Sequence, residues 1–182
     1  MVINHFSNPL FIGNFTTNLV KDIVNSIRNE AKTAKNNTPI LASKYINKYK
    51  LQPISVDKAS LHTTFEAQKY VVTFSTIGSV DMLQYKPSEV SYPINRNWTN
   101  EILADKVKFI FEHQPEEAIL DALYENVFQT SKANGYLTTL NSEIEAWNNR
   151  LLELVESEIA KVNNEVESLN NFLKSVNPNP KI

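Results

Sequence analysis

The 182-residue chain contains no cysteine, which excludes disulfide bonds, thiolate metal sites and cysteine nucleophiles. Glycine is almost as scarce, since only Gly13, Gly78 and Gly135 occur. None of them stands in a GxxxxGK or GxGxxG setting that would hold a phosphate, and no serine stands in a GxSxG setting. These absences argue against kinases, dinucleotide enzymes and serine hydrolases.

Histidine is also rare. The chain has three: His5, His62 and His113. They never show the four-residue spacing of a helical metal pair, and only His113 has acidic neighbours, which are Glu112, Glu116 and Glu117. This junction gives a minor hypothesis of metal binding or acid–base chemistry; the alternative is a solvated junction whose acids favour the N-terminus of the next helix. We predict no catalytic residue, no metal ligand and no cofactor.

Long hydrophobic runs are missing as well. No stretch reaches the length of a membrane span, and the first 15 residues lack the basic segment and apolar run of a signal peptide. We therefore expect a cytoplasmic protein without a membrane partner. With 42% hydrophobic and 21% charged residues, the composition is typical of a folded chain and not of a disordered one.

The net charge is only −2, but the charge is uneven along the chain. Residues 1–60 hold eight basic and three acidic residues, an excess of +5, whereas the remaining 122 hold ten basic and seventeen acidic residues, an excess of −7. Such asymmetry indicates either a basic surface for an anionic partner or attraction between the two parts within one fold or oligomer.

Periodic hydrophobic residues predict two helices near the start of the chain. Residues 15–35 place apolar side chains along one helical stripe, and residues 39–49 form a second, shorter helix that Thr38 caps. From residue 51 to residue 114 the pattern alternates and is rich in β-branched and aromatic residues, as in YVVTFSTIGSVDMLQY and KVKFIFE. We predict four to six short antiparallel strands there, with a tight turn near Gly78.

The remaining chain is predicted to be helical. Residues 115–132 begin with proline and two glutamates, and a very long helix follows over residues 138–176. Prolines stop this helix, so residues 177–182 are predicted to be a tail or a linker. The fold class is therefore α+β: one domain over residues 1–182, with N-terminal helices, a small antiparallel sheet and a long C-terminal antiparallel helical hairpin or coiled coil over residues 115–176.

The long helix carries an apolar seam at spacings of three and four residues, as in a coiled coil with one stutter. We expect residues 115–132 to cover the first half of this seam. The second half then needs either the N-terminal helix of the same chain, which would make the protein a compact globule, or a helix of another molecule. We expect the second case, in which the protein is a homo-oligomer or binds a partner helix. The candidate interface residues are Ile159, Val162, Val166, Leu169, Leu173 and Val176, with Phe172 beside them.

The segment SKYINKYK interleaves basic and aromatic residues at the end of the second predicted helix. Its candidates for a nucleic-acid interface are Lys44, Tyr45, Lys48, Tyr49 and Lys50. Proteins that bind single strands use lysines for phosphates and aromatic rings for base stacking. The alternative is structural, because two tyrosines at helical spacing usually pack on a core, and lysines near a helix end are favoured by its dipole.

An N-terminal amphipathic helix, a strand-rich middle, the segment LTTLNSEIEAWNNRLLELVESEI and a proline-bearing end follow one another in this chain. This order resembles the N-terminal regions of bacterial multidomain conflict and phage-defence proteins, which implies a scaffold that precedes an effector domain. The resemblance is to a pattern and transfers no functional residue. From the residues we predict a non-catalytic assembly module that oligomerises through its long helix; the alternative is nucleic-acid binding, and an enzyme around His113 comes third.

Overall fold

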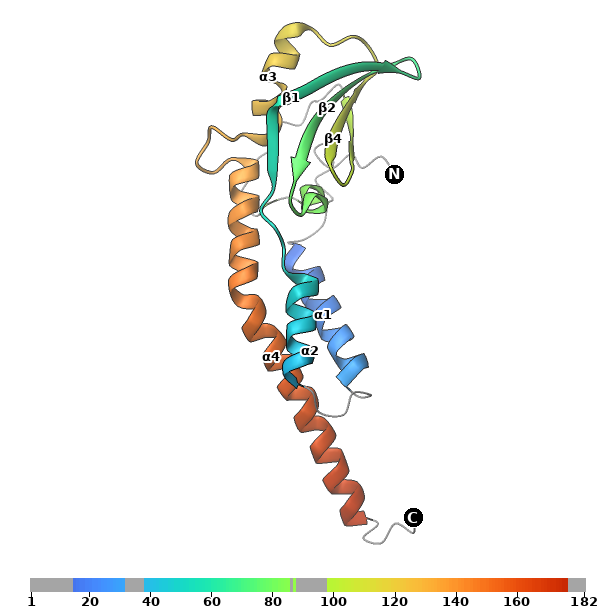
Figure 1. The fold of residues 1–182 in the computed structure, drawn as a ribbon, viewed down its shortest axis with the longest axis vertical. Helices are drawn as coiled ribbons and strands as arrows, with labels where there is room; N and C mark the ends of the chain where they lie inside the picture. Colours follow the sequence, from blue (N-terminus) through green and yellow to red (C-terminus); the bar gives the residue numbers. More distant parts are fainter. Residues whose placement is uncertain (1–14, 32–37, 86, 88–97, 177–182) are drawn as a thin grey trace. The chain divides into compact units, whose positions relative to one another are not determined.

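The computed structural model describes residues 15–31, 38–85, 87 and 98–176 (Figure 1). In chain order the elements are α1 (Phe15–Ala31), α2 (Thr38–Tyr49), β1 (Ser55–Glu66), β2 (Lys69–Ile77), the 3₁₀ helix η1 (Val80–Gln84), β3 (Trp98–Ile102), β4 (Lys106–Phe111), α3 (Glu117–Phe128) and α4 (Tyr136–Val176). The predicted α+β class and the long C-terminal helix are confirmed. The predicted tail at residues 177–182 lies outside the described residues. No helix in the described ranges is both long and apolar enough to cross a membrane.

The four described strands form one antiparallel sheet in the order β1-β2-β4-β3. The sequence of β4 alternates, so that Val107, Phe109 and Phe111 are buried and the residues between them are half-exposed. On the same face of β2, the Phe74 ring meets the Phe109 ring edge to face, with 6.0 Å between centroids. This face of the sheet carries the core.

Helix α3 covers that face with an aromatic side chain. The Phe128 ring lies 6.1 Å from the Phe74 ring and 6.2 Å from the Phe109 ring, measured between centroids, and Leu123 and Val127 are buried beside it. The helix ends at Gln129, which adopts the left-handed conformation with φ 51°. The apolar face of α3 is therefore occupied by the sheet.

The hairpin of β1 and β2 turns at Ala67 and Gln68, which have positive φ values of 49° and 66°. Two successive left-handed residues match the type I′ turn, whose twist suits a hairpin. The chain also turns at Gly78 (φ 102°), but it then enters η1 and not a strand. The prediction of a strand after Gly78, in the second half of YVVTFSTIGSVDMLQY, is therefore wrong. A Cβ at Gly78 would lie 2.1 Å from the Pro53 carbonyl oxygen, so this close approach requires glycine.

Strand β1 contains a bulge. The pairing of its residues with β2 shifts between Asp57–Ser75 and His62–Thr73, so that four residues of β1 face a single residue of β2. Ser60 holds the bulged stretch in place, because its Oγ accepts the N–H of Ser75 at 2.7 Å and donates to the Asp57 carbonyl oxygen at 2.6 Å.

The beginning of α4 is anchored by two polar side chains. Buried Tyr136 donates its hydroxyl to the Leu83 carbonyl oxygen at 2.7 Å, and the Asn141 amide accepts from the N–H and donates to the C=O of Ile54 at 2.7 and 2.8 Å. The sequence had suggested residues 115–132 as the antiparallel cover of this half of the helix. In the structure, Phe128 of α3 packs on the sheet, and Figure 1 shows α3 beyond the first turn of α4 and not alongside the helix.

The described residues divide into two compact units, and α4 contributes to both. The sheet unit contains Leu51–Trp147 with Phe15, and the helical unit contains Thr16–Lys50 and the part of α4 after residue 147. The buried apolar side chains of the helical unit include Ile23, Ile27, Leu41, Tyr45, Tyr49, Leu151, Val155, Ile159 and Val162. Each unit thus has its own buried side chains, and one domain over residues 1–182 stays a prediction.

Candidate interaction surface and pocket

The apolar seam of α4 changes from buried to exposed within one helical turn. Ile159 and Val162 are each 1% exposed, whereas Val166 is 37% and Leu169 is 58% exposed. The spacing of three and four residues continues across this step, so one helix face is buried before it and open after it. We call the exposed residues the C-terminal stripe; it consists of Val166, Leu169, Phe172, Leu173 and Val176.

The step follows from the lengths of the helices in the helical unit. α1 has 17 residues and α2 has 12, which corresponds to about 26 Å and 18 Å at about 1.5 Å per residue. Residues 148–176 of α4 extend over about 44 Å on the same basis. Figure 1 shows the last turns of α4 running past the ends of both shorter helices. The ion pair between Arg28 Nη2 and Glu165 Oε1, at 3.9 Å, lies just before the stripe.

The structure therefore divides the predicted oligomer interface. Ile159 and Val162 are covered by the chain itself, as in the intramolecular alternative, and they have no surface to offer a second molecule. The other four predicted residues are exposed, and Phe172, at 62%, widens the apolar surface beside them. The physical reason is simple: α1 and α2 are long enough to cover the seam to Val162 and too short to cover the rest.

The predicted nucleic-acid residues lie on α2, except for Lys50, which follows it. Tyr45 and Tyr49 are only 2% and 7% exposed, whereas the three lysines are exposed. Both tyrosines share the face that packs on α1, where the Tyr45 hydroxyl donates to the Ser26 carbonyl oxygen at 2.8 Å. Base stacking needs an accessible ring, so this arrangement removes the aromatic half of the predicted interface.

Glu30 of α1 engages one of the predicted lysines. Lys44 Nζ lies 2.6 Å from both carboxylate oxygens of Glu30, and the single proton of the Tyr45 hydroxyl is shared between Glu30 Oε2 and the Ser26 carbonyl oxygen, each at 2.8 Å. The hydrogen bonds from Lys44 and Tyr45 lower the pKa of Glu30 below its ordinary value of 4.5. Burial, together with the bond to Glu30, raises the pKa of Tyr45 far above its usual range. This cluster links α2 to α1. The Glu30 carboxylate also neutralises Lys44, whose positive charge an anionic ligand would need.

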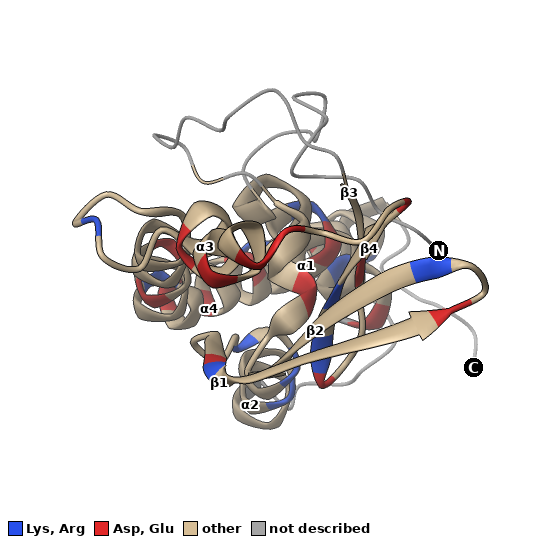
Figure 2. Ribbon diagram, turned by 90° about the horizontal axis from the view of Figure 1, so that it is seen from above, with Lys and Arg blue, Asp and Glu red and all other residues tan. Residues whose placement is uncertain are grey.

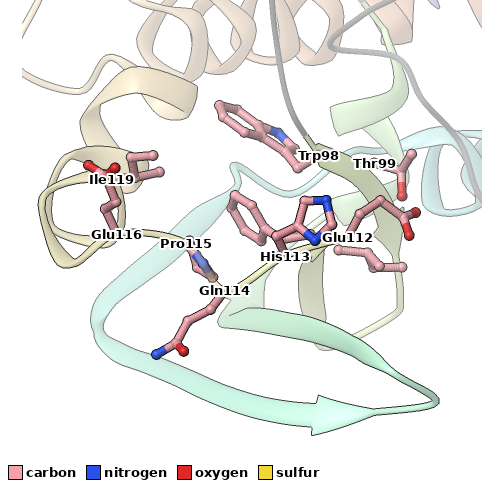
Figure 3. A pocket seen from close by; sticks show the side chains of 10 residues that line it. Trp98, Thr99, Glu112, His113, Gln114, Pro115, Glu116 and Ile119 are labelled. Atoms are coloured by element: carbon pink, nitrogen blue, oxygen red, sulfur yellow. The ribbon is translucent and has the colours of Figure 1, made fainter.

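A pocket of about 580 Å³ opens where β3 begins and β4 ends (Figure 3). Trp98 of β3 and Phe111 of β4 form its aromatic wall, and the loop between β4 and α3 supplies His113 and Glu116. Ile119 from the start of α3 lies on the side of Glu116 in Figure 3, opposite Trp98. The pocket thus joins aromatic, aliphatic and acidic side chains from the sheet, a loop and a helix.

The pocket brings together part of the predicted histidine group. His113 lines it with Glu112 and Glu116, whereas Glu117 is not among the lining residues. Glu112 is engaged elsewhere, since its Oε1 lies 2.8 Å from Lys69 Nζ. Within the described ranges no three His, Asp or Glu side chains are placed to hold a metal ion. The geometry therefore gives no support to metal chemistry at this junction.

Sequence reasoning missed the aromatic wall of this pocket. Trp98 and Phe111 are far apart in the sequence and become neighbours only through the pairing of β3 with β4. The available signal was that each lies at the end of an alternating segment, but the alternation does not show which strands pair. No protein-family model, curated protein or solved structure matches the chain.

Proposed function

We propose that the protein is a non-catalytic assembly module and that two copies pair through the C-terminal stripe. The observation that carries the proposal is the change along one helix face, from 1% exposure at Val162 to 58% at Leu169 and 67% at Val176. Leaving such side chains in water forgoes burial energy, and a contiguous apolar patch marks an interaction site on protein surfaces. A second copy of the chain supplies an identical row of side chains.

An antiparallel orientation suits this row. With a two-fold axis at Asn171, the midpoint of residues 166–176, each half of the stripe meets the opposite half on the other copy. The two Phe172 rings then lie on the same flank near the axis, where they can contact each other.

The expected dimer is weak. Complete burial of a Val, Leu or Phe side chain is worth about 1.5 to 3 kcal/mol, and the stripe residues are on average about half exposed, so two copies gain roughly 10 kcal/mol. Association alone costs about 4 to 15 kcal/mol. With the smallest of these costs a net gain of about 6 kcal/mol remains, which corresponds to a dissociation constant of about 40 micromolar. The dimer fraction should therefore depend on protein concentration in the range of tens of micromolar and above.

Sedimentation equilibrium over a range of protein concentrations tests the proposal. We expect the wild-type mass to rise towards that of two chains, and Leu169→Asp to keep the mass of one chain under the same conditions. Leu152→Asp is the matched control, because Leu152 lies on the same helix and is 51% exposed but stands outside the stripe. A wild-type mass of one chain at every concentration, or an equal loss in the control, would contradict the proposal.

Engineered cysteines report the orientation, since the chain has none of its own. In the antiparallel register, residue 166 of one copy faces residue 176 of the other. Mixing Val166→Cys with Val176→Cys should therefore give a disulfide-linked pair of the two variants, whereas Val176→Cys alone should cross-link poorly. Efficient cross-linking of Val176→Cys alone would show a parallel pair and overturn the orientation.

Two further expectations stay predictions. The resemblance to N-terminal regions of conflict and phage-defence proteins implies a scaffold ahead of an effector domain, and self-association would serve such a scaffold. For the nucleic-acid alternative, Lys48 and Lys50 are exposed and could contact phosphates, whereas the rings of Tyr45 and Tyr49 are buried. Binding of labelled single-stranded DNA at two salt concentrations would test it, because phosphate contacts weaken with salt.

A further inference from the structure

Four aromatic side chains form a row across one end of the sheet. Phe65 of β1 pairs with Tyr70 of β2, Tyr70 pairs with Phe111 of β4, and Phe111 pairs with Trp98 of β3. Directly paired residues point to the same face, so all four rings share one face of the sheet. The centroids are 4.8 Å apart for Phe65 and Tyr70 and 5.6 Å apart for Trp98 and Phe111. The assembly proposed above makes no use of this row.

Helix α3 covers this face of the sheet away from the row. Its Phe128 packs on Phe74 and Phe109, which lie further along β2 and β4. At the row itself, the chain forms the loop that leads from β4 into α3, and the pocket lies at the Trp98 end. Figure 3 shows the Trp98 ring on one side of the pocket and Glu116 with Ile119 on the other.

The charged lining of this pocket is acidic. Glu112 and Glu116 line it together with His113, and neither lysine nor arginine occurs among its described lining residues. Lys69 pairs with Glu112, whereas Glu116 has no ion pair within the ranges that the structure describes. Acidic positions continue along α3, as Figure 2 shows. A pocket of this sign attracts cations and repels phosphates and carboxylates.

We propose that this pocket binds an organic cation, an alkylammonium or guanidinium group, held at the Trp98 ring with Glu116 as its counter-ion. A cation over an indole face is attracted by the ring quadrupole, and indole is the strongest such surface among the side chains. Phe111, Pro115 and Ile119 supply apolar contacts for methyl groups or for the stem of the ligand. The volume of about 580 Å³ lies within the usual range for small-ligand pockets.

Two competing ligand classes fit this pocket less well. A metal ion would need a set of ligating side chains, and the described residues offer no group of three. A nucleotide would find rings for stacking, but its phosphates would face Glu116, whose charge no described basic side chain neutralises, since Lys69 pairs with Glu112. Among its described lining residues the pocket combines aromatic rings and carboxylates and has no lysine or arginine, as in sites that recognise ammonium groups.

Calorimetric titration of the full chain with choline tests the proposal. We expect saturable binding in the millimolar range that weakens as salt is added. The neutral alcohol 3,3-dimethylbutan-1-ol has the shape of choline without its charge, and it should bind at least about tenfold more weakly. Arginine amide and a short lysine-containing peptide identify the source of the cation. Tighter binding of the peptide than of choline would indicate a peptide side chain, and tighter binding of choline or arginine amide would indicate a free small molecule. Absence of saturable binding for every cation, or equal binding of the alcohol, would overturn the proposal.

Matched variants place the ligand in the pocket. Glu116→Gln should weaken choline binding about five- to tenfold, whereas Glu117→Gln, one residue further and outside the lining, should leave it unchanged. Trp98→Leu should abolish binding, and Trp98→Phe, which keeps a ring and serves if the leucine variant does not fold, should weaken it about threefold. Equal effects of the two glutamine variants would overturn the assignment of Glu116 and the proposal with it.

Discussion

The helical unit and the sheet unit differ in how their exposed apolar side chains are arranged: Phe65 and Ile77 of the sheet unit are exposed at separate positions, whereas α4 of the helical unit exposes a continuous row. The helical unit leaves apolar residues in water, with Leu169 and Val176 more than half exposed. The sheet unit buries a polar residue, because Asn100 of β3 is 0% exposed and its amide nitrogen and oxygen have no hydrogen-bond partner in the described part of the chain. A partner molecule would cover the exposed apolar row, whereas Asn100 lies inside the fold, where an unpaired amide costs stability. The exposed apolar row of α4 thus supports a proposed binding surface, whereas the unpaired Asn100 amide lowers the free energy of unfolding.

The largest expected effect compares a buried and an exposed position of the same seam. Ile159→Asp places a carboxylate at a site that is 1% exposed, so the free energy of unfolding should fall by about 4 kcal/mol or more. Leu169→Asp should change it by less than about 0.5 kcal/mol at concentrations where the chain is monomeric. Urea unfolding followed by far-UV circular dichroism measures both. Similar losses in the two variants would show that the stripe is packed within the chain.

Gly78 tests whether the sheet unit depends on single backbone positions. Gly78→Ala combines a φ of 102° with a Cβ only 2.1 Å from the Pro53 carbonyl oxygen, so we expect a loss of at least about 2 kcal/mol in unfolding free energy. Ala67→Gly is the control, since Ala67 already has a positive φ of 49° and glycine relieves it. The control should change stability by less than about 0.5 kcal/mol. A neutral Gly78→Ala in the same urea titration would contradict the close approach.

Substitutions of Asn100 test whether its unpaired amide lowers the stability of the sheet unit. Asn100→Val removes both unpaired amide groups and adds a β-branched residue, so unfolding free energy should rise by about 1 kcal/mol. Asn100→Asp, of similar size but charged, should lower it instead. Thermal and urea unfolding of the three proteins give the order of stability. A less stable valine variant would show that the amide is satisfied in solution.

The smallest effect concerns the acid stability of the helical unit. Because the pKa of Glu30 is lowered in the folded state, its ionised form contributes stability above pH 4.5, and this contribution is lost as the pH falls below 4.5 through the folded value. Glu30→Gln should therefore lose less stability than the wild type between neutral pH and acid. Tyr45→Phe, which removes one donor to Glu30, should have a smaller effect of the same sign. Parallel curves of stability against pH for all three would contradict the role of this cluster.

The helices of this fold could be predicted because their apolar residues recur every three or four positions. The spacing placed α1 to α4 and the whole seam of α4, including its continuation to Val176. The spacing does not show which molecule covers a seam, and the boundary between Val162 and Val166 depends on where α1 and α2 end in space. Ile159 and Val162 of the predicted interface are therefore buried within the chain itself, and the interface stays a prediction.

The sheet was harder to predict because its contacts depend on strand order and register. Alternation identified β2 and β4, but it cannot show that β2 lies between β1 and β4, or that Phe65, Tyr70, Phe111 and Trp98 align. The hairpin turn at Ala67 and Gln68 contains no glycine, so it lacked the usual signal. The aromatic wall of the pocket followed from these pairings and was likewise not readable from the sequence, whereas His113, Glu112 and Glu116 could be singled out because they are neighbours along the chain.

The bulge in β1 has a consequence for how copies of this protein meet. β1 lies at an edge of the described sheet, and a long edge strand is a template for edge-to-edge aggregation. Between Asp57 and His62, however, the regular ladder is interrupted and local bonds from Ser60 tie the strand to itself and to Ser75. An incoming strand would meet a broken row of donors and acceptors. The irregularity thus works against amyloid-like stacking of copies at this edge of the sheet.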